Sequence, residues 1–226
     1  MDSIKLEKKI LSRNDHLAAE IRQMFRSKGI AVLNMVSSPG SGKTSLLEKT
    51  LSDLSSDMRV AVIEGDIQTE NDARRIAATG VPVHQINTGG ACHLEAGMVR
   101  DSLVNFDLDN LELLVIENVG NLVCPSAFDL GENQRVALIS TTEGDDKPLK
   151  YPAMFHTAHV MVINKIDLLP FTDFSVDEVI RNARSLNPDI RILKTSCRTG
   201  EGLDDWADYV REFVAETRRH GDTETR

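Results

Sequence analysis

The sequence predicts an α/β fold with three layers, in which a mostly parallel central sheet carries helices on both faces. Two observations lead to this prediction. Apolar, strand-like runs alternate with amphipathic, helix-like stretches along the chain, and such alternation favours a parallel sheet that is covered on both sides. The first apolar run, residues 31–36, is followed at once by a loop that ends in Gly42, Lys43 and Thr44. A strand, such a loop and a helix are the usual beginning of a phosphate-binding domain.

The first expected element is an amphipathic helix at residues 5–28, because apolar residues such as Leu17, Ile21 and Met24 recur at helical spacing before Gly29. Strands are expected at residues 31–36, 59–64, 81–86, 111–117, 134–140, 158–163 and 190–195. Helices are expected at residues 45–54, 70–79, 93–105, 175–186 and 202–219. The predicted organisation is an N-terminal helix at 1–29, one α/β domain at 30–219 and a flexible polar tail at 220–226.

Residues 37–44 have the pattern of a phosphate-binding loop. Glycines at 40 and 42 let backbone N–H groups curl round a phosphate, and the following helix adds positive charge at its N-terminus. Lys43 is placed to reach the β- and γ-phosphates, and the Thr44 hydroxyl to hold Mg²⁺. Ser37 stands where the pattern usually has its first glycine. The expected nucleotide-binding residues here are Pro39, Gly40, Ser41, Gly42, Lys43, Thr44 and Ser45.

A second motif indicates guanine as the base. Asn164, Lys165 and Asp167 follow a short apolar strand. A carboxylate there accepts hydrogen bonds from N1 and N2 of guanine, a pair of donors that adenine does not offer. Ser196 and Cys197, after the last expected strand, resemble the final guanine-contacting loop of G proteins. A P-loop kinase is the competing class, but it normally lacks both segments, so the pattern favours the G domain of a P-loop NTPase that hydrolyses GTP to GDP and phosphate.

Two acidic residues follow strands at the same edge of the expected sheet. Asp66 and Glu117 both come at strand ends, and ligands of parallel sheets bind at those ends. We expect both carboxylates to help Thr44 hold Mg²⁺, and Asp66 also to orient the attacking water. The alternative is that each acid only caps the next segment. Lys43, Asp66 and Glu117 are therefore the expected catalytic residues.

Composition limits the class of protein. The chain has 226 residues, a hydrophobic content of 41% and a formal net charge of −9. This length suits one domain, and the acidic balance argues against a nucleic-acid surface. No apolar run approaches the ~20 residues of a membrane span. We therefore expect partners other than nucleic acid or membrane. Three cysteines cannot all pair within one chain, so we also expect a reducing, cytoplasmic setting.

Three residues with metal-binding chemistry are expected at the same edge of the sheet. Cys92 and His93 lie just past one strand, and Cys124 follows Glu117. Thiolate and imidazole suit Zn²⁺ or Ni²⁺. The alternative is that the cysteines are small buried side chains. Four of the other histidines are more typical of structural positions: His16, His84, His156 and His159.

Together these segments resemble the HypB family, nickel-inserting GTPases of [NiFe]-hydrogenase maturation in the SIMIBI class of P-loop GTPases. The resemblance covers roughly residues 30–215. It rests on the phosphate loop, the run at 64–73, Cys92-His93, the run at 116–125 that reads Ile-Glu-Asn-Val-Gly-Asn-Leu-Val-Cys-Pro, and the run at 143–152. Ser37 matches the family's own form of the loop.

The resemblance implies more than the residues alone. It implies that Cys92, His93 and Cys124 bind nickel or zinc, that GTP favours a homodimer, and that a HypA-type nickel metallochaperone and the hydrogenase large subunit are partners. Two alternatives remain at this point: a urease-maturation GTPase of the UreG type, and a regulatory GTPase whose cysteines hold structural zinc. The Cys92, His93 and Cys124 set fits the HypB family better than the UreG type.

Overall fold

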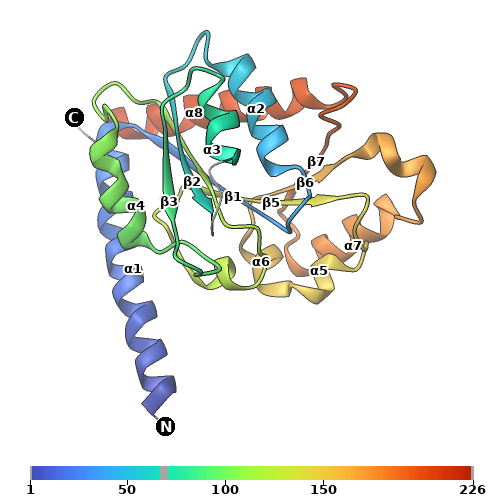
Figure 1. Ribbon diagram of the computed structural model, residues 1–226, viewed down its shortest axis with the longest axis horizontal. Helices are drawn as coiled ribbons and strands as arrows, with labels where there is room; N and C mark the ends of the chain where they lie inside the picture. Colours follow the sequence, from blue (N-terminus) through green and yellow to red (C-terminus); the bar gives the residue numbers. More distant parts are fainter. Residues whose placement is uncertain (1, 67–70, 225–226) are drawn as a thin grey trace.

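The computed structural model describes residues 2–66 and 71–224. Its centre is one seven-stranded sheet in the order β3-β2-β4-β1-β5-β6-β7, and every neighbouring pair is parallel (Figure 1). The strands are β1 (Ala31–Ser37), β2 (Val60–Asp66), β3 (Val83–Asn87), β4 (Leu113–Glu117), β5 (Gln134–Ser140), β6 (Val160–Asn164) and β7 (Arg191–Lys194). The predicted α/β fold class is confirmed.

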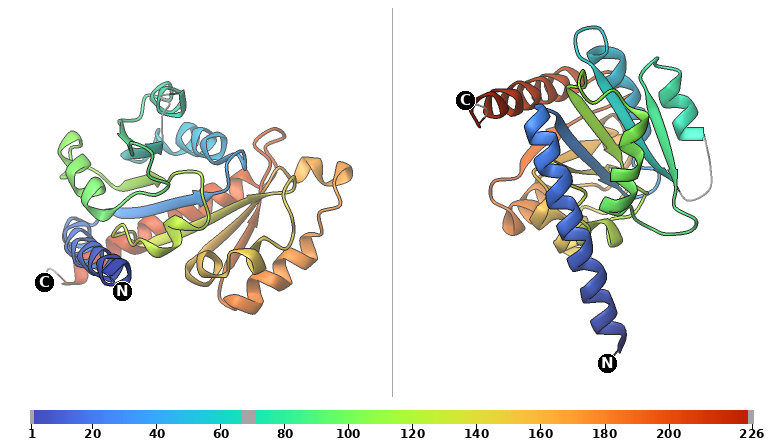
Figure 2. Two further views of the ribbon diagram at one scale, coloured as in Figure 1. Left: turned by 60° about the horizontal axis from the view of Figure 1, so that its bottom comes forward. Right: turned by 90° about the vertical axis from the view of Figure 1, so that its left-hand side faces the viewer.

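Helices cover both faces of this sheet (Figure 2). The α-helices are α1 (Asp2–Lys28), α2 (Lys43–Leu54), α3 (Asn71–Ala77), α4 (Ala96–Ser102), α5 (Lys147–Lys150), α6 (Pro152–Thr157), α7 (Val176–Leu186) and α8 (Leu203–Glu224). Short 3₁₀ turns are η1 (Leu103–Asn105), η2 (Cys124–Ala127) and η3 (Ile166–Phe171). α2, α3 and α8 pack on one face, whereas α1, α4, α6 and α7 pack on the other.

The sheet contributes side chains to a hydrophobic core on each of its two faces, because its central strands are apolar on both sides. Val32 of β1 packs against α1 and α4, while Leu33 packs against α2 and α8. Strands buried on both faces are expected to read as unbroken apolar runs rather than as alternating ones. α1 packs on the edge of the domain through Ala18, Ile21 and Phe25, and its N-terminal part projects past the sheet (Figures 1 and 2).

Some expected elements differ from those in the structure. The helix expected at 93–105 begins only at Ala96, because Cys92 and His93 lie in a loop. α8 continues to Glu224, so residues 220–224 extend this helix rather than forming a separate polar tail. The part of that tail at 225–226 and the expected helix start at 70 lie outside the described residues. The two short helices α5 and α6 were not expected from the sequence.

Candidate functional site

A cleft runs along the carboxyl ends of β1, β2, β4 and β6 in two adjoining parts. The first part, about 530 Å³, lies over the phosphate loop and the ends of β2 and β4. The second part, about 500 Å³, lies beside Asn164, Asp167 and Cys197. Gly42, Ser45 and Lys165 line both parts. The two predicted nucleotide motifs therefore share one cleft whose size suits a small-molecule ligand.

Gly42 is fixed at its position by two independent constraints. Its φ is +95°, in the left-handed region, and a Cβ there would lie 2.5 Å from Nδ2 of Asn164. The Asn164 amide in turn donates to the Ser41 carbonyl at 2.9 Å, and Lys165 Nζ donates to the Gly40 carbonyl at 2.6 Å. Gly40 also has a positive φ, of 76°. The base motif thus holds the phosphate loop in shape, and the two were read from the sequence as separate signals.

Lys43 and Thr44 converge on one buried carboxylate. Glu117 is 0% exposed, and its Oε1 accepts from Lys43 Nζ at 2.8 Å and from the Thr44 hydroxyl at 2.6 Å. Its Oε2 is buried and has no hydrogen-bond partner among the described residues. A hydroxyl and carboxylate oxygens are the ligand types that Mg²⁺ prefers, so these residues fit the ion.

Two more acidic groups lie beside Glu117. Asp66 ends β2 and lines the phosphate part of the cleft, as expected. Glu64, which the sequence analysis did not select, lines the same part and is only 2% exposed. Burial, together with the charges of Glu117 and Asp66, raises the pKa of Glu64 to about 8. The sequence contains a pattern that could have identified Glu64. It lies two residues before Asp66 on the same strand, so both side chains are on one face of the sheet.

The Ser41 hydroxyl is engaged behind the phosphate loop rather than in the cleft. Ser41 does not line the cleft, and its hydroxyl donates to Glu143 Oε1 at 2.7 Å. Glu143 also pairs with Lys147 at 2.8 Å, and Lys147 donates to the Ser38 hydroxyl at 3.0 Å. Burial acts to raise the pKa of Glu143, but the hydrogen bonds from Lys147 and Ser41 outweigh it and lower that pKa. Glu143 and Lys147 therefore support the loop from behind.

Arg75 is a further cleft residue that the sequence did not single out. It lies on α3, lines the phosphate part of the cleft, and donates to the Ser45 hydroxyl at 3.0 Å. The same guanidinium pairs with Glu48 at 2.5 Å and with Asp72 at 3.3 Å. It brings a further positive charge, besides Lys43 and Lys165, to the lining of this part of the cleft. No spacing signal in the sequence marks it, because its placement depends on how α3 packs against α2.

The base part of the cleft is lined by four of the five residues predicted for guanine, Asn164, Lys165, Asp167 and Cys197, whereas Ser196 is buried behind Asp167. Ser196 donates to Asp167 Oδ1 at 2.6 Å, and Thr195 donates to Asn164 Oδ1 at 3.1 Å. Cys197 lines the pocket, with its sulfur 3.7 Å from Asn164 Oδ1. These contacts hold Asn164 and Asp167 in place at the lining of the base part of the cleft.

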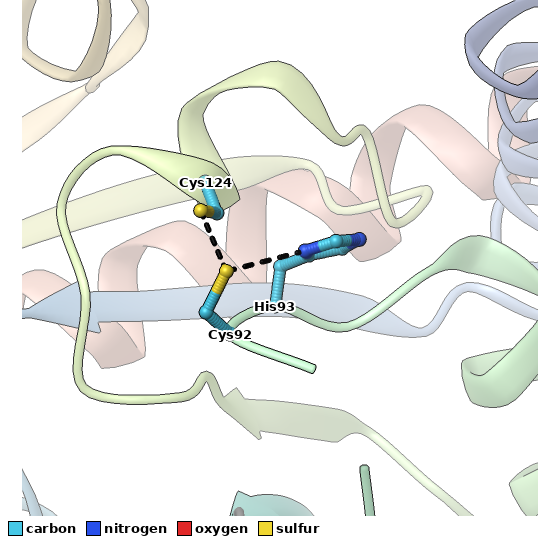
Figure 3. A group of neighbouring side chains, drawn as sticks. All are labelled: Cys92, His93 and Cys124. Carbon is cyan, nitrogen blue, oxygen red and sulfur yellow. Dashed lines mark hydrogen bonds between the residues drawn. The ribbon is translucent and has the colours of Figure 1, made fainter. Parts of the chain in front are cut away.

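The expected metal-binding residues converge although they come from distant parts of the chain (Figure 3). The ligand atoms of Cys92, His93 and Cys124 all lie within 4.8 Å of one another, and the two sulfurs are 2.6 Å apart. The His93 ring stacks on Phe128, with centroids 3.9 Å apart. The hydrogen bond to Cys124, followed by burial, raises the pKa of Cys92. Two thiols and an imidazole suit a borderline or soft divalent metal.

The segment between Glu117 and Cys124 contacts both sites. At its phosphate end, a Cβ on Gly120 would lie 3.3 Å from the Pro39 ring, which places this glycine directly against the phosphate loop. At its other end, Asn121 donates to the Cys92 carbonyl at 3.3 Å and accepts from the Val123 amide at 2.9 Å. One short segment therefore connects the phosphate loop to the cysteine and histidine cluster.

Among the described residues, no helix is long and apolar enough to cross a bilayer.

Comparisons with known proteins identify the family. Residues 31–194 match the family described as CobW/HypB/UreG, nucleotide-binding domain. The hydrogenase maturation factor HypB of Azotobacter vinelandii is 56% identical over 209 residues, which are 92% of this chain and 68% of that protein. The structure of HypB from Helicobacter pylori in complex with nickel is 42% identical with a TM-score of 0.86, and the match covers 91% of this chain and 97% of that one.

The structure of HypB from Archaeoglobus fulgidus is also similar. It is 37% identical with a TM-score of 0.84, over 90% of this chain and 99% of that one. Identities and coverage of this size leave no doubt about relationship: the chain belongs to the HypB family of hydrogenase maturation factors and contains its nucleotide-binding domain. The predicted resemblance is confirmed, and the UreG-type alternative is not favoured.

Proposed function

We propose that this protein hydrolyses GTP to GDP and phosphate and uses that cycle to deliver nickel for the maturation of a [NiFe]-hydrogenase. Membership of the HypB family supports the role in maturation. The observation that carries the coupling is the segment 117–124, which begins at the buried Glu117, lies against the phosphate loop at Gly120 and ends at Cys124. A change at the γ-phosphate therefore has a direct route to the metal ligands.

The proposed roles of the nucleotide site follow from its contacts. Asp167 reads N1 and N2 of guanine, supported by Ser196, while Lys43 neutralises the β- and γ-phosphates. Thr44, Asp66 and Glu117 would hold Mg²⁺, and Asp66 would also orient the attacking water. The ion neutralises charge that develops on the phosphate oxygens.

For the metal, one protomer supplies Cys92, His93 and Cys124. A closed structural zinc site normally has four ligands, so three ligands fit a site that is completed from elsewhere. Two protomers related by a two-fold axis bring six ligands. We propose that GTP favours a homodimer whose interface shares nickel or zinc, and that hydrolysis loosens both the interface and the metal. A HypA-type metallochaperone and the hydrogenase large subunit are the donor and acceptor that the family resemblance supports.

The test is a metal titration in two nucleotide states. Nickel and zinc are titrated into protein loaded with Mg²⁺ and either GDP or a non-hydrolysable GTP analogue, while the mass in solution is measured. We expect the analogue to produce a dimer and to change metal affinity. Linkage requires metal to change the affinity for the analogue by the same factor. Equal metal affinities and an unchanged monomer in both states would overturn the coupling and favour structural zinc.

A cysteine series assigns the metal. The double variant Cys92→Ala/Cys124→Ala removes both sulfurs of the cluster, and we expect it to lose nickel and zinc binding. Cys197→Ser is the matched control, because Cys197 lies in the base part of the cleft rather than in the cluster. Retained metal binding in the double variant would move the site elsewhere in the protein.

A further inference from the structure

Glu64 and Glu117 form a pair of acids across two neighbouring strands. β2 and β4 are parallel neighbours, and Glu64 lies opposite Glu117 in their register. Val60 and Val62, which alternate with Glu64 on the same face of β2, pack in the core beneath α2 and α8. Since side chains alternate between the two faces of a sheet, Glu64 faces the helix α2 that carries Lys43 and Thr44.

Glu64 is buried and incompletely paired. It is 2% exposed, and its Oε2 has no hydrogen-bond partner among the described residues. It lines the phosphate part of the cleft together with Lys43, Asp66 and Gly120. A buried polar atom without a hydrogen bond is costly, and a cation bound in the phosphate part of the cleft, which Glu64 lines, would offset that cost.

The charges around Glu64 strengthen this interpretation. Lys43 is engaged by Glu117, and Arg75 is engaged by Glu48 and Asp72. Glu64, Asp66 and Glu117 therefore crowd three acidic side chains at the phosphate part of the cleft, without a free cation from Lys43 or Arg75. A nucleoside triphosphate would add more negative charge next to these carboxylates, and only a cation between them turns that repulsion into attraction.

We propose that Glu64 is a third carboxylate of the Mg²⁺ site, a positioning residue that accepts hydrogen bonds from water bound to the ion. Mg²⁺ dehydrates reluctantly and keeps several waters in such sites, so a second layer of carboxylates is a way to hold its hydration shell. This inference rests on the proposed GTP site. It predicts that Glu64 makes tight nucleotide binding depend on Mg²⁺, rather than contributing to nucleotide binding as such.

The experiment compares wild-type protein with Glu64→Gln. Binding of a fluorescent, non-hydrolysable GTP analogue is followed while free Mg²⁺ is varied in an EDTA buffer. We expect half-saturation to require about tenfold more Mg²⁺ in Glu64→Gln, as is usual for loss of a hydrogen bond to a charged group. Without Mg²⁺ the variant should bind the analogue at least as well as wild type, because an uncharged amide repels the phosphates no more than the acid does.

Two further variants separate positioning from folding. Glu64→Asp keeps the charge and should lie between wild type and Glu64→Gln in its need for Mg²⁺. Glu216→Gln removes an exposed charge from α8 and should match wild type. The same Mg²⁺ dependence in Glu64→Gln and wild type would overturn the inference, while the proposed function would stand. A wild-type protein that binds no GTP analogue at any Mg²⁺ concentration would overturn both.

Discussion

The two parts of the nucleotide cleft differ in how their polar groups are satisfied. In the base part, Asn164 binds the Ser41 carbonyl and accepts from Thr195, and Asp167 accepts from Ser196. In the phosphate part, the buried Oε2 atoms of Glu64 and Glu117 have no hydrogen-bond partner among the described residues. The first part is complete in itself, whereas the second is arranged for cations and phosphates.

This difference assigns the two parts different tasks. A hydrogen-bonded pocket needs no rearrangement to read a base, so it provides specificity at little cost in ordering. A pocket of buried acids is unfavourable until a cation is bound, so cation binding there changes the energy of the segments that carry those acids. The metal-binding cluster is attached to the second part through the segment 117–124. We therefore expect the phosphate part to regulate the metal-binding cluster and the base part to determine which nucleotide binds.

The largest effect is expected from Lys43→Ala, which breaks the phosphate part. The β- and γ-phosphates lose their main counter-cation, and Glu117 is left as a buried charge without its ion pair. Removing one member of a buried pair costs about 3–5 kcal/mol, so we expect both loss of GTP binding and a lower free energy of unfolding. Calorimetry and chemical denaturation measure the two. Lys194→Ala, at an exposed lysine on β7, is the control and should change neither.

Asp66→Ala should separate binding from turnover in the same part. Asp66 is proposed to orient water, so the variant should retain GTP binding and lose about 10²-fold in hydrolysis rate, a usual contribution of a positioned acid or base. Single-turnover phosphate release with Mg²⁺ measures the rate, and binding of the non-hydrolysable analogue is the control. Turnover equal to that of wild type would contradict the role in positioning water.

Asp167→Asn should change the base part without affecting the phosphate part. Loss of the contact to guanine N1 and N2 should weaken GTP binding by about 1–3 kcal/mol and improve binding of xanthosine triphosphate, whose base offers the complementary pattern. Calorimetry with both nucleotides tests this, and Mg²⁺ dependence should stay as in wild type. An unchanged GTP affinity would remove Asp167 from base recognition.

The smallest effect concerns pH in the absence of Mg²⁺ and nucleotide. Burial raises the pKa of Glu64 to about 8, so between its ordinary range and pH 8 the folded protein binds a proton that the unfolded chain has lost. The free energy of unfolding should therefore fall as pH rises through this window, by at most about 1.4 kcal/mol per pH unit. Chemical denaturation in EDTA at several pH values measures it. Glu64→Gln should flatten the decline, and parallel curves for the two proteins would contradict the assignment.

Patterns that are local in the sequence predicted the structure well. The strand expected at 134–140 is β5 with the same bounds, and the phosphate and base motifs occupy one cleft. Both depend on short runs whose backbone geometry is set by neighbours in the chain. The cluster of Cys92, His93 and Cys124 was also found, because strand ends in a parallel sheet meet at one edge.

Features that depend on packing between distant segments were missed. The helix expected at 93–105 begins at Ala96, since His93 stacks on Phe128 and its loop follows that contact rather than the helical periodicity. Arg75 enters the cleft through the packing of α3 on α2. The sequence places Glu64 on the same strand face as Asp66, but its position opposite Glu117 follows only from the pairing of β2 with β4, and strand order cannot be read from a list of strands.

The contact between Gly42 and Asn164 restricts how this protein can evolve. A side chain at position 42 would collide with the Asn164 amide, and a larger side chain at 164 would press on the loop that this amide supports. Each residue thus restricts substitution of the other, because a change at either one disturbs both the phosphate loop and the base motif. Asp167 lies outside this contact. New nucleotide preferences are therefore most accessible to selection at Asp167.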